Sequence, residues 1–86
     1  MKEFAYSNHA LDQMKLRHIS RKIVESVLTK PLDIIKENGD MIYQAIATME
    51  KRKYLIRVFV VNKNNIHLIK TVYRTSKITK YYEGKI

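Results

Sequence analysis

The hydrophobic pattern of this chain changes its period at its only proline, Pro31. Between residues 7 and 30 the apolar side chains recur every three or four positions, which predicts amphipathic helices. After Pro31 they fall into short runs rich in β-branched and aromatic residues, separated by turn signals, which predicts strands. The chain therefore divides into a helical part followed by a strand-rich part.

Two serines mark the starts of the helices. Ser7 precedes a helix predicted over about Asn8–Arg17, and Ser20 precedes one over about Arg21–Thr29, because a serine hydroxyl can accept a backbone N–H that the first helical turn leaves without a partner. Pro31 ends the second helix, since a proline disfavours helical conformation at the residue before it. This second helix is the more clearly amphipathic, with an apolar stripe of Ile23, Val24, Val27 and Leu28.

Four strands are expected after the proline. Asn38-Gly39 is a strong hairpin signal, because both residues tolerate positive φ. A charged turn at residues 50–53 and a polar turn at 63–65 separate the later strands. Residues 75–86 form either a helical turn or a short edge strand, and the pattern does not decide between them. The expected strands are Leu32–Glu37, Asp40–Met49, Tyr54–Asn62 and Ile66–Arg74.

Short turns between consecutive strands predict an antiparallel meander. The expected fold class is therefore α+β, with two N-terminal helices packed on one face of a four-stranded antiparallel sheet, in one domain over residues 1–86. Both helices need the same face to bury their stripes, so the other face is expected to be open. Simple alternation along the last strand puts Lys70, Val72 and Arg74 on the opposite side from Ile69, Thr71 and Tyr73.

The net charge of the chain is +9, from 17 lysines and arginines against eight acids. Residues 50–86 hold ten of these cations and two of the acids, so the excess lies in the last two strands and the tail. Such a field concentrates phosphate-bearing partners. Nucleic acid is the partner that it favours first; an acidic protein, or a surface that only confers solubility, are the alternatives.

Composition excludes or disfavours several chemistries. The chain has no cysteine, so it has no disulfide, thiolate metal site or cysteine nucleophile. Its two glycines are far apart, which rules out a glycine-rich phosphate loop, and its acids lack both metal-ligand spacing and a hydrolytic pair. Neither a metal nor a cofactor is expected. The start of the chain lacks the apolar run of a secretory signal and no stretch suits a membrane span, so a cytoplasmic location is expected.

The first predicted helix carries a polar ridge at positions i, i+4 and i+8, formed by His9, Gln13 and Arg17. His9 is either a catalytic acid or base, or a border histidine that bonds a carbonyl. Arg17 has a planar fork that suits a phosphate. The other two histidines, His18 and His67, are expected to serve packing, capping or a rim position.

Arg57 is unusual because most of its neighbours in its strand are apolar. Burying an arginine there is unfavourable unless the side chain reaches solvent or an anion. Beside tyrosines it suits RNA, since the guanidinium can bind phosphate and the rings can stack on unpaired bases; an arginine extending from a sheet edge is the alternative. The tail is either a nucleic-acid clamp or an ordinary charged terminus, with Lys77, Lys80, Tyr81, Tyr82 and Lys85.

A resemblance to a known family runs through nearly the whole chain. It is carried by Ser7-Asn8-His9-Ala10, Met14, Arg17, Ile19-Ser20, Val24, Val27-Leu28 and Pro31, and later by Ile69, Thr71-Val72-Tyr73 and Lys80-Tyr81. These motifs resemble small bacterial toxins of the RelE/ParE/BrnT type, within the barnase–EndoU–colicin–RelE nuclease superfamily. The resemblance implies a helical layer on a four-stranded sheet and a metal-independent ribonuclease, commonly the toxin of a toxin–antitoxin pair.

Carried over residue by residue, the resemblance places His9 and Arg17 in the helix motif of that family. Thr71, Tyr73, Lys80 and Tyr81 match its C-terminal motif. Gln13 departs from the pattern, because the family usually has an arginine there, so one cation of the expected set is missing.

The leading hypothesis is RNA cleavage by the substrate's own 2′-hydroxyl, in which a base takes that proton, cations stabilise the phosphorane and an acid protonates the leaving oxygen. The expected catalytic residues are His9, Arg17, Tyr73 and Lys80. The expected RNA-binding residues are Arg57, Lys70, Thr71, Arg74, Lys77 and Tyr81. All are expected to converge on one solvent-facing surface.

The expected partners are RNA, including ribosome-bound mRNA, and an acidic antitoxin protein. The main alternative is a non-catalytic toxin-like domain that binds RNA or inhibits a protein target. A structural subunit whose basic surface is buried by an acidic partner is a third hypothesis.

Overall fold

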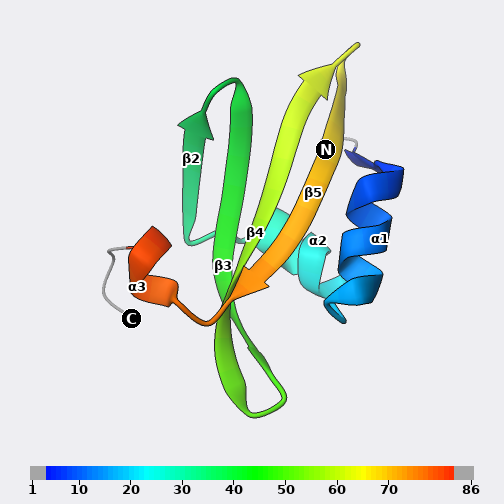
Figure 1. Cartoon of the computed structure of the whole chain (residues 1–86). Coiled ribbons are helices and arrows are strands. Elements are labelled where there is room, and N and C mark those ends of the chain that lie inside the picture. The colour runs from blue at the N-terminus through cyan, green and yellow to red at the C-terminus, as the bar shows by residue number, and fades with distance from the viewer. Residues whose placement is uncertain (1–3, 83–86) are drawn as a thin grey trace.

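The computed structural model describes residues 4–82, in which the chain forms three helices and one five-stranded sheet of order β1-β5-β4-β3-β2 (Figure 1). The fold class is α+β. Lys85, named above with the tail, lies outside the described residues. In chain order the elements are β1 (Phe4–Tyr6), α1 (Asn8–Leu16), α2 (Arg21–Thr29), β2 (Asp33–Glu37), β3 (Asp40–Met49), β4 (Arg52–Lys63), β5 (Ile66–Thr75) and α3 (Ile78–Tyr81).

Helices α1 and α2 begin where their serine caps predict. The Ser7 hydroxyl accepts the backbone N–H of Ala10 at 3.0 Å, and the Ser20 hydroxyl accepts that of Ile23 at 3.2 Å. Helix α2 has the predicted bounds, and α1 ends one residue earlier than predicted, at Leu16. Both capping predictions are confirmed.

Helix α1 ends in a left-handed turn at His18, whose φ is +56°. The N–H of Ile19 donates to the carbonyl of Met14 at 2.8 Å, and the N–H of His18 donates to that of Lys15 at 3.4 Å. These are the two bonds of a Schellman motif. Ile19 and Met14 are both buried, whereas His18 is exposed, so His18 serves as a cap and not as a packing residue.

Strands β2 to β5 form the predicted antiparallel meander. In each of the three turns between these strands, both central residues have positive φ. This conformation gives a turn whose twist matches that of the strands it joins. The charged turn is shorter than predicted, so β4 begins at Arg52 instead of Tyr54. The turn residues with positive φ are Asn38 and Gly39, Glu50 and Lys51, and Asn64 and Asn65.

The sheet contains a fifth strand that the sequence pattern does not predict. β1 runs parallel to β5, with Phe4 opposite His67 and Tyr6 opposite Ile69, so the sheet is mixed and the expectation of four antiparallel strands is wrong on this point. The N–H of Ser7 donates to the carbonyl of Ile69 at 3.0 Å, and its hydroxyl donates to that of Lys70 at 2.8 Å. Three residues carry too little pattern to reveal a strand that depends on hydrogen bonds from β5.

A β-bulge interrupts β5. Phe59 pairs with Thr71, but the next residue of β4 pairs with Ile69, which leaves Lys70 without a partner on β4. An extra residue reverses the alternation beyond it, so Ile69 and Val72 both belong to the core. The expected grouping of Ile69 with Thr71 and Tyr73 on one face is therefore wrong.

Helices α1 and α2 cover one face of the sheet, as expected from their stripes. α1 packs mainly against β5, and α2 packs against β3 and β4. No helix within residues 4–82 is long and apolar enough to cross a membrane. The core beneath the two helices consists of Ala10, Met14, Ile19, Val24, Val27, Tyr43, Ile56, Val58, Val60, Ile69 and Val72.

The opposite face of the sheet is partly covered by α3, which corrects the expectation of an open platform. Figure 1 shows α3 across the sheet from α1 and α2. The chain after β5 turns back so that Tyr81 lies over Arg57, and Leu55 and Ile42 on this face are also buried. We refer to this side of the sheet as the α3 face.

Candidate functional site

Arg57 is the only charged side chain that is buried among residues 4–82, with 7% of its surface exposed. It lies on the α3 face, because its neighbours Ile56 and Val58 point into the core beneath α1 and α2. Gln44 is its cross-strand partner on β3, and Tyr73 is its partner on β5. The register of three adjacent strands therefore places these three side chains in a row.

Hydrogen bonds hold the guanidinium of Arg57 in place. Its Nε donates to Oε1 of Gln44 at 3.0 Å, and one of its terminal nitrogens donates to the hydroxyl of Tyr73. Gln44, which is fully buried, donates in turn from Nε2 to the backbone carbonyl of Tyr81 at 3.2 Å. Gln44 thus links the arginine to the end of α3.

Aromatic rings surround the guanidinium on its other sides. Its central carbon lies 4.5 Å from the ring centroid of Tyr81, 5.3 Å from that of Phe59 and 5.6 Å from that of Tyr73, within the range of cation–π attraction. Tyr73 stacks on Phe59 and meets Tyr81 edge to face. We call Gln44, Arg57, Phe59, Tyr73 and Tyr81 the Arg57 box.

No carboxylate within residues 4–82 balances the charge of Arg57. A single ion pair is closer than 4 Å in that range, and it joins Lys70 to Asp40. The box instead stabilises the cation with neutral oxygens and ring faces. A guanidinium in such a setting favours a phosphate, whose oxygens its fork can bind in pairs.

Four of the other expected site residues lie at or beside the box. Tyr73 and Tyr81 are part of it. The ammonium of Lys80 lies 5.3 Å from the ring centroid of Tyr81, and Thr71 pairs with Phe59 on the same face of the sheet. Lys77, at the start of α3, is exposed. The α3 face therefore collects cations and rings, as RNA-binding surfaces do.

His9 and Arg17 do not reach this surface. Both belong to the helical layer, His9 on α1 and Arg17 as its C-cap, and that layer covers the opposite face of the sheet. Arg17 donates a hydrogen bond to Oε1 of Gln13 at 2.9 Å, so two residues of the polar ridge are bonded to each other. The expectation that His9, Arg57 and Tyr73 converge on one surface is therefore wrong, because the sheet separates them.

Lys70 and Arg74 are also placed away from the box. The bulge directs Lys70 to Asp40, with Nζ at 2.9 Å from a carboxylate oxygen. Arg74 pairs with Ile56, and its guanidinium lies 4.4 Å from the ring centroid of Tyr54, on the helix-covered side. Asp40 alternates with Ile42 and Gln44, so the Lys70–Asp40 pair lies on the α3 face outside the box, whereas Arg74 lies on the opposite face.

His67 occupies a rim position at the junction of β5 and β1, where its ring lies 5.4 Å from that of Phe4. Within residues 4–82 no three side chains of histidine or acidic type lie close enough together to hold a metal ion. The ionisable side chains in or beside the Arg57 box are those of Arg57, Tyr73, Tyr81 and Lys80.

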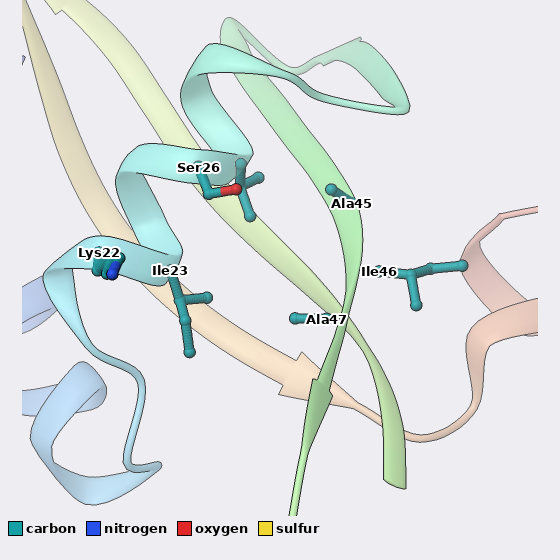
Figure 2. A pocket seen from close by; sticks show the side chains of 7 residues that line it. Lys22, Ile23, Ser26, Ala45, Ile46 and Ala47 are labelled. Carbon is teal, nitrogen blue, oxygen red and sulfur yellow. The ribbon is translucent and has the colours of Figure 1, made fainter. Parts of the chain in front are cut away.

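A shallow groove lies on the other side of the sheet, between α2 and β3 (Figure 2). Its volume is about 280 Å³, and small side chains at Ala45 and Ala47 leave the space open. In Figure 2 Ile46 points the other way, toward the side of the sheet where α3 lies. The groove has few polar groups with which to recognise a ligand. It is lined by Lys22, Ile23, Ser26, Val27, Ala45, Ile46 and Ala47.

Two members of the box, Gln44 and Phe59, are not among the expected site residues. Phe59 alternates with Arg57 along β4, but the sequence pattern does not reveal Gln44. It occurs in a strand with mostly apolar residues, as Arg57 does, and the signal that connects the two is the hairpin register that places Gln44 opposite Arg57. That register depends on a two-residue turn at Glu50 and Lys51. The sequence shows four charged residues at 50–53 and does not indicate which two of them form the turn.

Fold and site together define a small basic α+β domain that holds an arginine in an aromatic box on one face of its sheet. Residues 6–76 match the family described as a domain of unknown function, DUF4258. The chain belongs to this family. The matched region contains α1, α2, strands β2 to β5 and Arg57, and it ends before α3. No curated protein and no solved structure matches the chain.

Proposed function

We propose that this domain binds single-stranded RNA on its α3 face and cleaves it without a metal ion. The observation that carries the proposal is Arg57, a buried cation that has no carboxylate partner within residues 4–82 and is surrounded by tyrosines. A phosphodiester supplies the anion that such a site favours, and its bases supply partners for the rings.

The reaction proposed is transfer of the phosphodiester to the neighbouring 2′-oxygen. The 2′-oxygen bonds to phosphorus, the bond to the 5′-oxygen breaks, and the products carry a 2′,3′-cyclic phosphate and a 5′-hydroxyl. Arg57 stabilises the charge that develops on the phosphoryl oxygens. We assign the two proton transfers to the Tyr73 hydroxyl and the Lys80 amine, so this version of the hypothesis excludes His9 and Arg17 from the reaction.

A second candidate is RNA binding without cleavage. It is favoured by the position of His9, because the residue best suited to acid–base chemistry at neutral pH lies in the layer on the other face of the sheet. With either candidate, we propose that the domain is a cytoplasmic toxin that acts on messenger RNA, free or bound to ribosomes. An acidic antitoxin neutralises it. Inhibition of a protein target is the remaining alternative.

The test of the proposal measures binding and cleavage separately, with an end-labelled single-stranded RNA in the presence of a chelator. Arg57→Lys keeps the charge but loses the fork, and we expect affinity to fall about 10- to 100-fold. Tyr73→Phe is expected to slow cleavage about 10²- to 10⁴-fold, with a smaller change in affinity. His9→Ala is the control and is expected to cleave as the wild type does.

Two neighbouring cations provide a matched control for the face that binds. Lys53 alternates with Arg57 and lies on the α3 face, whereas Arg52 pairs with Met49 on the opposite face. Lys53→Ala is expected to lower the salt dependence of binding by about 0.7 in log–log slope, as for one lost phosphate contact. Arg52→Ala is expected to leave it unchanged.

The outcomes separate the two candidates. Wild-type binding without cyclic-phosphate products supports the non-catalytic domain. Binding that is independent of salt, or equal in wild type and Arg57→Lys, overturns both. Growth arrest on expression, relieved by a co-expressed acidic neighbour, is the corresponding test of the toxin role.

A further inference from the structure

The arginine that RNA would need is covered. Only 7% of the surface of Arg57 is exposed, so a phosphate has little access to a guanidinium that is enclosed by Gln44, Tyr73 and Tyr81. Two of these three side chains come from β3 and β5 and belong to the sheet. Tyr81 belongs to α3, which is therefore the part of the enclosure that is able to leave without breaking the sheet.

Helix α3 is weakly attached compared with the other helices. It has four residues, fewer than an isolated helix needs. Its N-cap position, Lys77, makes no capping hydrogen bond through its side chain. The described contacts between its end and the box are the hydrogen bond from Gln44 to the Tyr81 carbonyl and the ring of Tyr81 over the guanidinium. Each contributes on the order of 1 kcal/mol or less.

Removing α3 does not disassemble the rest of the box. Arg57 keeps its bonds to Gln44 and Tyr73, which both come from neighbouring strands. The side of the guanidinium that lies against the Tyr81 ring is then free, and the arginine is already held in position for an anion. A phosphate in place of the Tyr81 ring also replaces a weak cation–π contact of Arg57 with charge-assisted hydrogen bonds.

From these observations we infer that α3 is a displaceable cover over a concealed phosphodiester site at Arg57. An RNA phosphate takes the place of the Tyr81 ring, and the covered form lowers the apparent affinity by the fraction of molecules that are closed. The inference rests on the proposed RNA binding and adds its regulation. Lys80 belongs to α3 and leaves with it, so in the open form water takes over the proton transfer proposed for Lys80. A contact that keeps α3 in place keeps the domain inactive, and a contact that displaces α3 activates the site.

The first experiment compares Tyr81→Ala with Tyr82→Ala, the adjacent tyrosine that lies outside the box. If Tyr81 is a cover, removing its ring strengthens binding of a 12-nucleotide single-stranded RNA by about threefold to tenfold, and Tyr82→Ala leaves the affinity unchanged. Weaker binding of Tyr81→Ala shows that the ring stacks on a base and overturns the cover. Equal affinity in all three proteins overturns it as well.

The second experiment follows the ring itself. The chain has no tryptophan, so Tyr81→Trp places a single fluorophore over Arg57, and Tyr82→Trp provides the control. On addition of the RNA we expect the emission of Tyr81→Trp to shift to longer wavelength, as the indole leaves the box for water. Unshifted or blue-shifted emission at saturating RNA contradicts an opening of α3.

Failure of the cover and failure of RNA binding give different results. If wild type and Tyr81→Ala bind RNA equally and Arg57→Lys abolishes binding, the proposed function stands and the cover is rejected. If neither wild type nor Tyr81→Ala binds RNA, the site itself is rejected.

Discussion

The two faces of the sheet are covered in different ways. α1 and α2 lie on one face, each with a serine cap and an apolar stripe, and the interior beneath them is built mainly from apolar side chains. α3 lies on the other face, has no side-chain cap and covers an arginine and a glutamine. The first layer contributes to stability through apolar burial; the second mainly shields polar groups.

This difference indicates where the molecule can open. Displacing α1 or α2 exposes apolar core, which is strongly unfavourable in water. Displacing α3 exposes a cation that water solvates well, so part of the lost contact energy is recovered. A functional site is therefore better placed under α3 than under the N-terminal helices.

The largest effect is expected under the helical layer. Ile56 is fully buried in the core beneath α1 and α2, and Ile56→Ala is expected to lower the free energy of unfolding by about 2–5 kcal/mol. Tyr81→Ala, on the other face, is expected to lower it by about 1 kcal/mol or less. Urea denaturation of both variants tests this, and comparable losses would show that α3 is as integral as the other helices. If Ile56→Ala does not fold, Ile56→Val provides the comparison, with an expected loss of about 0.5–1.5 kcal/mol.

The next effect concerns the polar pair beneath α3. Gln44→Leu leaves the Nε of Arg57 buried without its acceptor, and we expect the free energy of unfolding to fall by about 1–3 kcal/mol. In an Arg57→Met background the same substitution is expected to be nearly neutral, because no donor is then orphaned. A double-mutant cycle measures the difference. If the effects of the two substitutions on the free energy of unfolding are additive, water already bonds to Arg57. The two faces of the sheet would then differ less in how they are covered than proposed.

A smaller effect distinguishes the two serine caps. Ser7 caps α1 and also bonds to Ile69 and Lys70 of β5, whereas no contact to the sheet is described for Ser20, which caps α2. Ser7→Ala is expected to cost about 1–2 kcal/mol of unfolding free energy and Ser20→Ala about 0.5–1 kcal/mol. Thermal or urea unfolding would contradict this if Ser20→Ala proved the more damaging of the two.

The smallest effect is a dependence on alkaline pH at Tyr6, which belongs to β1 and lies against Arg21 of α2. Burial, and then the nearby charge of Glu25, raise the pKa of Tyr6, while Arg21 acts in the opposite direction. The folded state therefore holds this proton more tightly than the unfolded state, and the stability that results is present below about pH 10 and is lost as the pH rises through the folded pKa. Urea midpoints measured upward from pH 9 should fall less steeply for Tyr6→Phe than for the wild type, and equal slopes would contradict the shift.

Most of the fold follows from local pattern. The serine caps, the bounds of α2 and the meander of β2 to β5 are all predicted because each depends on side chains within a few residues. β1 and the bulge at Lys70 are not predicted, because both depend on hydrogen bonds between segments far apart in the sequence. α3 lies in the tail, where the pattern leaves helix and strand equally open.

The candidate site is predicted in part for the same reason. Arg57 stands out from its apolar neighbours in a single strand, and Tyr73 shares its face after the bulge is taken into account. Gln44 joins them only through hairpin register. His9 is misplaced because helical spacing defines a ridge on a helix but not the face of the sheet that the helix covers.

The parallel pairing of β1 with β5 has a consequence for how the protein forms. Ser7 and Lys70, which meet at this junction, are 63 residues apart in sequence. A nascent chain therefore cannot complete its first strand until the last strand has left the exit tunnel, and the docking of α1 onto β5 must wait with it. Contacts of such long range slow folding, so the pairing of β1 with β5 is expected to be a late step in folding.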